Sequence, residues 1–151
     1  MVEDAIAEVV KLCKKKNIPI RVGINSGSLE KKILAKYGGV TPEAFCESAA
    51  NCVNILRGYD FSDIVVSMKA STVKITCDSY RLFRQRFPEI PLHVGVTEAG
   101  TLKRGLIKSS IGIGSLLLDG IGETIRVSLT ADPVEEISAA KIILQSCGLK
   151  D

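Results

Sequence analysis

Apolar and polar residues alternate in four short segments of this chain, and the alternation predicts four β-strands. The segments span residues 21–25, 63–69, 93–97 and 124–130. Because successive side chains of a strand point to opposite faces, residues of equal parity share one face. In each segment one parity is apolar, and the other carries cations, hydroxyls, an amide, a histidine or glycine. The members of this polar parity are Arg21, Gly23, Asn25, Ser67, Lys69, His93, Gly95, Thr97, Arg126, Ser128 and Thr130.

Segments with helical periodicity lie before, between and after the strands. We expect helices over about 2–16, 29–37, 42–57, 77–87, 106–119 and 133–147. Thr41, Thr76 and Asp132 are the expected N-caps, since their side chains can accept a hydrogen bond from a free N–H of the first turn. Gly58 and Gly120 are expected to end two of these helices, because glycine readily adopts the left-handed conformation found there.

This order, one helix followed by four strand–helix units, predicts parallel strands joined by right-handed crossovers. An open doubly wound sheet and part of a barrel both fit it. A sheet covered by helices on both faces should have almost continuously apolar strands, whereas a (β/α)8 barrel binds ligands at the C-terminal ends of its strands. The polar parity therefore favours the barrel. Because such a barrel needs about 250 residues, we expect residues 1–151 to form a single α/β domain, a parallel half-barrel that is a fragment of a TIM barrel.

The composition narrows the classes of function. The 151 residues include 20 basic and 17 acidic side chains, a balance too even for a nucleic-acid-binding arm. The longest apolar stretch, 111–118, is far shorter than the roughly 20 residues that cross a bilayer. Five cysteines are scattered without a Cys-x-x-Cys pair, which indicates core thiols in a reducing compartment. We therefore expect a cytoplasmic protein with no metal site in this chain and with neither a nucleic-acid nor a membrane partner.

Arg21, Lys69 and Arg126 are expected to point from three different strands into a common interior. Burying three cations without counter-charges would be very costly. A multiply charged anion would compensate them, since arginine offers a planar fork of donors and lysine a point charge. The pattern thus favours a phosphate or diphosphate ligand. The alternative is that Asp63 and Glu98 neutralise part of the set within an ordinary polar layer of the barrel.

Other polar positions have more than one interpretation. Glu98 follows the third strand, where barrel loops place catalytic groups, so it could orient a substrate hydroxyl, move a proton or form a loop salt bridge. His93 has no second histidine or cysteine beside it and is interpreted as a core imidazole rather than a metal ligand. The loop 25–28 follows a strand and could hold an oxyanion on free N–H groups. The two glycines of segment 111–114 indicate close packing of a helix on the sheet, not a dinucleotide fingerprint.

Four long motifs resemble those of one enzyme family. They are residues 21–30, 63–71, 92–100 and 122–130, which read RVGINSGSLE, DIVVSMKAS, LHVGVTEAG and GETIRVSLT. They are similar, in the same order, to motifs of the 4-hydroxy-3-methylbut-2-enyl diphosphate synthases. The resemblance implies the reductive ring opening of 2-C-methyl-D-erythritol 2,4-cyclodiphosphate in the non-mevalonate pathway of isoprenoid biosynthesis. It also implies an oxidoreductase with a 4Fe-4S cluster that receives electrons from ferredoxin or flavodoxin.

The resemblance also assigns roles to individual residues. By matching position, Arg21, Asn25, Lys69, Arg126 and Ser128 correspond to contacts with the substrate diphosphate and to pocket residues. Glu98 matches the barrel carboxylate that faces the cluster, a candidate for proton delivery during loss of a hydroxyl group. In the family a separate C-terminal domain holds the cluster on three cysteines and a glutamate, and none of the cysteines in this chain occupies such a position.

The resemblance covers the second half of the family's barrel domain. We expect that the first half and the cluster-binding domain have no counterpart in these 151 residues, and that the chain alone is therefore inactive. A half-barrel exposes two sheet edges, which proteins usually cover. Two copies could pair edge to edge as a homodimer, or the fragment could aggregate. Two further interpretations remain open, a non-catalytic diphosphate-binding module and a half-barrel that complements a separate partner chain.

Overall fold

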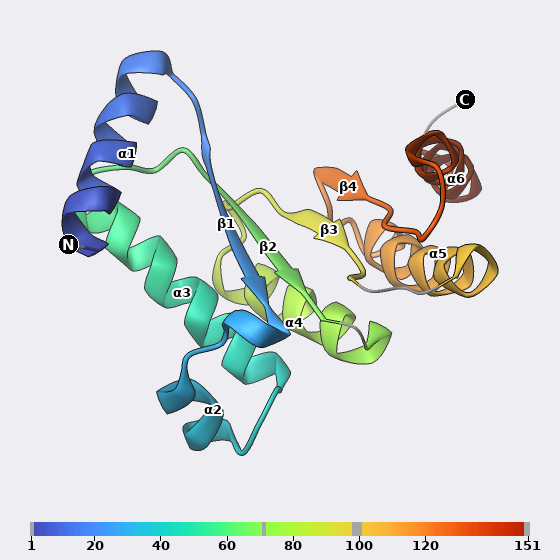
Figure 1. Cartoon of the computed structure of the whole chain (residues 1–151), viewed down its shortest axis with the longest axis horizontal. Coiled ribbons are helices and arrows are strands. Elements are labelled where there is room, and N and C mark those ends of the chain that lie inside the picture. The colour runs from blue at the N-terminus through green and yellow to red at the C-terminus, as the bar shows by residue number, and fades with distance from the viewer. Residues whose placement is uncertain (1, 71, 98–100, 150–151) are drawn as a thin grey trace.

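The computed structural model describes residues 2–70, 72–97 and 101–149, in which helices alternate with strands (Figure 1). The strands are β1 (Ile20–Asn25), β2 (Ile64–Lys69), β3 (His93–Gly95) and β4 (Thr124–Arg126). The helices are α1 (Val2–Lys16), α2 (Lys31–Tyr37), α3 (Pro42–Gly58), α4 (Val73–Arg86), α5 (Leu102–Leu118) and α6 (Pro133–Ser146), with a 3-10 turn, η1 (Ser26–Ser28), after β1. Within these ranges no helix is long and apolar enough to cross a membrane.

The four strands run parallel and lie side by side in chain order. β1 pairs with β2, and β3 pairs with β4. The partners run in register from Ile20 and Ile64 to Asn25 and Lys69 in the first pair, and from His93 and Thr124 to Gly95 and Arg126 in the second. A parallel bridge between Val66 and Leu92 joins the two pairs. A helix lies between each strand and the next, as parallel pairing requires.

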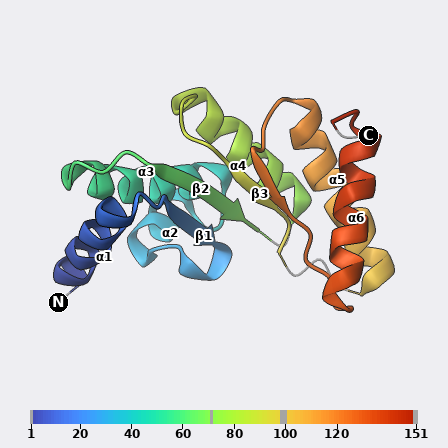
Figure 2. The same ribbon diagram turned by 90° about the horizontal axis from the view of Figure 1, so that it is seen from above.

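Helices cover one face of this sheet. α3 packs on β1 and β2, α4 on β2, α5 on β3 and α6 on β4, and Figure 2 shows α3, α4 and α5 along the same side of the strands. The core lies where the apolar parity of the strands meets these helices. Its fully buried members include Phe45, Val53, Val66, Met68, Tyr80, Phe83, Leu92, Val94, Ile113 and Leu116. The polar parity lies on the opposite face.

The glycines of α5 show how closely the helices approach the sheet. A Cβ added to Gly112 would lie 2.6 Å from Cγ2 of Val96, well inside van der Waals contact. A Cβ at Gly114 would lie 3.8 Å from the sulfur of Cys147, which is an ordinary distance. The predicted role of these glycines in helix–sheet packing is therefore confirmed for Gly112.

The predicted fold class is confirmed. The chain is α/β, its strands are parallel, and the described strands do not close into a barrel, as expected for part of one. Two predicted caps are also present. Thr41 Oγ1 accepts a hydrogen bond from the N–H of Ala44 at 3.2 Å, and Asp132 Oδ1 accepts one from the N–H of Val134 at 2.9 Å. Gly120 follows α5 with a φ of 72°.

The predicted start of α4 is wrong. The helix begins at Val73 rather than Cys77, because Thr76 is not its N-cap. The hydroxyl group of Thr76 is buried and hydrogen-bonds the backbone of Ala70 at the end of β2, at 3.2 Å from the nitrogen and 3.1 Å from the oxygen. A threonine near the start of a helix can therefore anchor the helix to a strand instead of capping it, and the sequence does not distinguish the two roles.

The predicted start of α5 and the predicted end of α3 are also wrong. α5 begins at Leu102 rather than at residue 106, since the N–H of Gly105 already bonds to the carbonyl of Thr101 at 2.6 Å. Glycine disfavours a helix by only about 1 kcal/mol relative to alanine, which is too little to exclude it from a first turn. Gly58 belongs to α3, and the left-handed residue after this helix is Asp60, with a φ of 54°.

β4 is shorter than the expected strand 124–130. Its ladder ends at Arg126, and the N–H of Leu129 donates to Glu136 Oε1 of α6 at 2.8 Å. This side chain satisfies the N–H in place of a neighbouring strand, and the segment bridges again at Thr130, which pairs in parallel with Thr101. Ser128 therefore lies in irregular chain, and the strand parity that placed it on the polar face does not apply there.

Candidate functional site

The polar parities of the four strands form rows across one face of the sheet. The row at the C-terminal end consists of Asn25, Lys69, Gly95 and Arg126, and the next consists of Gly23, Ser67, His93 and Thr124. Arg21 lies one row further down, beside Val65. Three of the residues predicted to bind the ligand thus share the row where the strands end, and a fourth comes from the same face. We call this surface the cationic face.

Lys69 is the half-buried centre of the cationic face. Its pKa falls from 10.5 to about 8 because of burial and of the positive charges of Arg126 and Arg21. Since the two arginines come from β4 and β1, positive charges on both sides of β2 act on Lys69 across the sheet. Like charges held this close raise the free energy of the ligand-free face.

The described residues give these cations no carboxylate. In the described ranges no ion pair joins Arg21, Lys69 or Arg126 to an acidic side chain. Asp63, the counter-charge suggested by the sequence, precedes β2 and lines a cleft at the opposite end of the strands. Lys69 is half-buried, whereas Arg21 and Arg126 are exposed to solvent, so the expected burial of three cations is wrong for the two arginines. The cost of burying an unpaired charge applies to Lys69 alone, and this cost favours an anionic ligand there.

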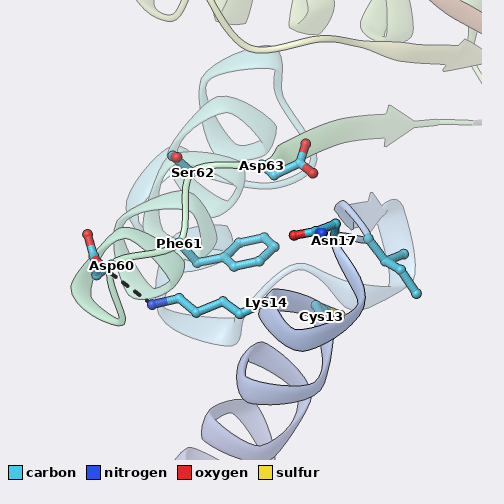
Figure 3. Close-up of a pocket in the computed structure, with 8 residues that line it drawn as sticks. Cys13, Lys14, Asn17, Asp60, Phe61, Ser62 and Asp63 are labelled. Atoms are coloured by element: carbon cyan, nitrogen blue, oxygen red, sulfur yellow. Dashed lines mark ion pairs between the residues drawn. The ribbon is translucent and has the colours of Figure 1, made fainter.

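That cleft has a volume of about 260 Å3 and lies at the N-terminal ends of β1 and β2 (Figure 3). Lys14, Asp60 and Asp63 are among the residues that line it, and Lys14 Nζ lies 3.7 Å from Asp60 Oδ2. Parallel α/β proteins bind their ligands at the C-terminal ends of the strands. We therefore assign the candidate site to the cationic face and not to this cleft.

His93 lies buried beside Lys69, in the row below. Its Nδ1 lies 2.8 Å from Thr124 Oγ1, and its Nε2 is buried and has no partner among the described residues. Burial, followed by the charges of Lys69, Arg21 and Arg126, lowers the pKa of His93 to about 4. The imidazole is therefore neutral at neutral pH and adds no further positive charge. The prediction of a satisfied core imidazole holds for Nδ1, which has a hydrogen-bond partner. It does not hold for Nε2, which has none among the described residues.

Gly95 gives Lys69 the space to cross β3. A Cβ at Gly95 would lie 2.6 Å from the carbonyl oxygen of Arg126 and 3.5 Å from Cε of Lys69. The lysine side chain runs past the glycine at an ordinary contact distance, and it is the backbone oxygen of Arg126 that leaves no room for a side chain at this position. Sequence parity assigned Gly95 to the polar face without indicating this role.

The remaining predicted residues are placed differently. Asn25 ends β1 beside Lys69, but its backbone N–H donates to Ser28 Oγ at 2.8 Å, so this N–H is not available for the oxyanion that the sequence suggested. Ser128 lies just beyond β4, in the segment that Glu136 holds. Glu98, the predicted catalytic carboxylate, lies outside the described residues.

Two residues contribute to this face that the sequence analysis did not single out. Thr124 holds His93, and it could have been assigned to the face because it has the parity of Arg126. Glu136 lies on α6 and holds the Ser128 segment through the backbone of Leu129. The periodicity of the sequence does not indicate the contact between Glu136 and Leu129, because it joins a helix to a segment without regular structure.

The cysteines of this chain do not suit an iron–sulfur cluster. Such a cluster is held by thiolates that lie close together. Cys13, Cys46, Cys52, Cys77 and Cys147 are all free, and burial raises the pKa of Cys46 and Cys52, which favours the protonated thiol. Among the described residues, no three side chains of the types His, Cys, Asp and Glu gather as a metal site requires. We therefore derive no cluster chemistry from these residues.

The family of the chain follows from its comparison with known domains. A profile of the GcpE TIM-barrel domain matches residues 1–141, which is nearly the whole chain. The chain belongs to the GcpE TIM-barrel family. In a GcpE TIM-barrel domain the row of polar residues where the strands end occupies the position at which barrels bind ligands.

Curated relatives of this GcpE-family chain share one name, 4-hydroxy-3-methylbut-2-en-1-yl diphosphate synthase (flavodoxin). The chain is 59% identical to the enzyme of Clostridium perfringens over 145 residues and 58% identical to that of Clostridium acetobutylicum over 146 residues. It is 54% identical to that of Caldanaerobacter subterraneus over 147 residues. The alignments cover 96–97% of the chain but 41–42% of each relative, so the chain spans about two fifths of the length of these relatives. The family resemblance of the four motifs is confirmed.

Replacing Gly95 by alanine should destabilise the GcpE-family chain. The added methyl group overlaps a backbone oxygen, which cannot move aside as a flexible side chain can, and overpacking of this kind costs about 1–3 kcal/mol. Urea denaturation measures the free energy of unfolding. Gly23→Ala is the matched control, because Gly23 lies on the same face and a Cβ there meets no atom within 4 Å. Equal losses in the two variants would contradict the close approach at Gly95.

Proposed function

We propose that this chain is the diphosphate-binding portion of a 4-hydroxy-3-methylbut-2-en-1-yl diphosphate synthase. In this role it holds 2-C-methyl-D-erythritol 2,4-cyclodiphosphate during reductive ring opening. The observation that carries the proposal is that Arg21, Lys69 and Arg126 share one face of the sheet, where the two arginines act on Lys69 and all three cations act on His93. The name shared by the similar enzymes supports it independently, since their product is a diphosphate.

Each cation suits a different part of a diphosphate. The guanidinium groups of Arg21 and Arg126 can each donate two parallel N–H groups to phosphoryl oxygens, and the ammonium group of Lys69 supplies a compact charge between them. Asn25, at the end of β1, and Ser128, beyond β4, would add neutral donors at the two sides of the row. The cationic face would thus contact the diphosphate from β1, β2 and β4.

Ring opening increases the negative charge that these residues meet. The bond that breaks joins a ring carbon to a phosphate oxygen, and its electron pair leaves with the diphosphate. Cations that are already in place stabilise this developing charge more strongly than the charge of the bound substrate. Lys69 suits this role, because a nearby anion raises its pKa and keeps it charged.

Two parts of the reaction lie beyond the described residues. Glu98 is the proposed proton donor to the hydroxyl group that is lost, and this role stays a prediction. The electrons would come from flavodoxin, which the relatives' name indicates, by way of a cluster that the cysteines of this chain do not suit. We therefore expect the chain alone to bind substrate without turning it over.

The 151-residue chain should bind inorganic pyrophosphate, with an affinity that isothermal titration calorimetry measures. Arg126→Ala removes charge-assisted hydrogen bonds worth about 1.5–3 kcal/mol, so the affinity should fall about 10- to 100-fold. Lys11→Ala is the control, because Lys11 is exposed on α1, and the affinity should stay within about twofold. Equal affinities of wild type and Arg126→Ala, or no saturable binding, would contradict the proposal.

Pyrophosphate affinity should fall as the pH rises above about 8. Below this pH Lys69 is charged in the free chain, whereas above it the lysine must take up a proton when the anion binds. The groups that face Lys69 are Arg21 on β1, His93 on β3 and Arg126 on β4. A guanidinium group is charged in any protein over this range, and the pKa of His93, about 4, keeps the histidine neutral. Lys69 is therefore the group on this face that titrates.

Lys69→Arg is the control for this pH dependence, because pyrophosphate itself also titrates. Arginine keeps its charge throughout, so the affinity of wild type relative to Lys69→Arg should drop by up to about tenfold per pH unit above pH 8. A ratio that does not change with pH would contradict the assignment.

Both free edges of the sheet are flanked by grooves. The groove beside β1 is apolar, has a volume of about 280 Å3, and has Val22 and Ile55 among its lining residues. The groove beside β4 has a volume of about 190 Å3 and is lined by apolar side chains, such as Ile125 and Ile137, and by the charged residues Arg126 and Glu136. We infer that two copies of this chain pair β1 of each with β4 of the other, which gives the eight parallel strands of a closed barrel.

Light scattering on a size-exclusion column should therefore give about twice the chain mass of 16.2 kDa. Ile55→Lys places a charge in the groove beside β1 and should give a folded monomer. Leu118→Lys is the control, because Leu118 is 73% exposed at the end of α5 and lines neither groove, and this variant should stay dimeric. A monodisperse wild-type monomer would rule out pairing through these edges.

A further inference from the structure

The sheet is interrupted between β2 and β3, inside the candidate site. At the bridge between Val66 and Leu92, the N–H of Val66 donates to the carbonyl of Pro91 at 3.0 Å. In a regular parallel ladder the next N–H of the same strand, that of Met68, would donate to the carbonyl of His93. A different group occupies this position.

The hydroxyl group of Tyr80 replaces the missing bond. Tyr80 reaches the strands from α4, on the apolar side of the sheet; its hydroxyl oxygen accepts a hydrogen bond from the N–H of Met68 at 2.9 Å and donates one to the carbonyl of His93 at 2.7 Å. Ser67, on the cationic face, is close enough to the same hydroxyl group to lower its pKa. Tyr80 is fully buried, and burial raises its pKa to about 12, so the hydroxyl group keeps its proton at neutral pH.

The inserted hydroxyl group widens the sheet at this point. A direct N–H···O bond holds neighbouring strands about 4.8 Å apart, whereas here an oxygen atom lies between the donor and the acceptor. Lys69 directly follows Met68, and its side chain runs past Gly95 on β3. The reach of Lys69 toward Arg126 therefore depends on the width of the gap that Tyr80 spans.

We propose that Tyr80 is a positioning residue for anion binding: its hydroxyl group sets the spacing of β2 and β3, and thereby the placement of Lys69 relative to Arg126. This inference rests on the proposed function, because the spacing matters to a ligand that contacts both cations. Tyr80 acts through Lys69 and does not touch the ligand. A purely structural role would lower stability when the hydroxyl group is lost, but it would leave the surroundings of Lys69 unchanged.

Tyr80→Phe removes the hydroxyl group and keeps the ring. Acetylation of Lys69 as a function of pH, followed by peptide mass spectrometry on the 151-residue chain, reports the pKa of this lysine without any ligand. The midpoint should lie at about 8 in wild type and should move by about half a pH unit or more in Tyr80→Phe, because its distances to the arginines change. An unchanged midpoint would overturn the proposal.

Phe83→Leu is the matched control on the same helix. Phe83 is also fully buried, but its ring stacks on Phe87, at a centroid distance of 4.7 Å, and it has no hydroxyl group to insert between the strands. This variant should lower the melting temperature and leave the Lys69 midpoint in place. An equal change of midpoint in both variants would assign the effect to general loosening and overturn the proposal.

Pyrophosphate titrations of the same proteins separate this inference from the proposed function. Where wild type binds, Tyr80→Phe should weaken the affinity about tenfold or more at a temperature at which it is folded, because small misplacements of binding groups are costly. Full affinity in this variant would overturn the inference. If wild type does not bind pyrophosphate and the Lys69 midpoint still moves, the proposed ligand is wrong and the positioning of Lys69 by Tyr80 stands.

A measurement on wild type covers the case in which Tyr80→Phe does not fold. Amide hydrogen exchange should show the N–H of Met68 as strongly protected as that of Val66, because its acceptor is a buried hydroxyl group. Rapid exchange at Met68 beside a protected Val66 would show that the hydroxyl bridge is absent, and the proposal would fall.

Discussion

The mutual repulsion of three cations on one face of the sheet is the constraint on which the rest of this structure depends. The backbones of Arg21, Lys69 and Arg126 keep their places on one face, since each residue belongs to its own strand and the paired strands are held in register. Burial is the larger cause of the lowered pKa of Lys69, and the charges of Arg126 and Arg21 lower it further. An anion reverses the sign of this interaction, so binding gains the new contacts and also relief from the old repulsion. A fold with such a face needs its stability from elsewhere.

That stability comes from the apolar face of the same strands. Val66, Met68 and Val94 are fully buried against the helices, and α5 approaches so closely that Gly112 has no room for a Cβ beside Val96. Apolar burial stabilises by about 25 cal/mol per Å2 of surface, and a close-packed core deforms little. The strands therefore cannot rotate to separate the charges on the other face. The apolar face of each strand thus supplies stability, and the polar face supplies the residues for binding.

Strand parity can be read from the sequence, whereas the spacing of strands cannot. Parity is local, so the common face of Arg21, Lys69 and Arg126 follows from alternation alone. The early end of β4 depends on Glu136, a side chain of α6 that takes a backbone N–H of the preceding segment. The gap between β2 and β3 depends on Tyr80, which reads in the sequence as an ordinary buried aromatic residue of a helix. In both cases a side chain takes the place of a backbone hydrogen-bond partner, and hydrophobic periodicity does not indicate which side chain does so.

The open edges of the sheet and the cationic face are energetically coupled. The described strands form one wall of the site, so a ligand bound there would keep one side in water, where charge interactions are weak. Four further parallel strands would exclude that water, and each contact between the ligand and the cations would gain strength in the lower dielectric. Linkage between two binding events is reciprocal. If the four further strands strengthen anion binding by some free energy, a bound anion strengthens the association of these strands by the same free energy. The repulsion on the empty face thus weakens the pairing of the two copies, and diphosphate binding should strengthen it.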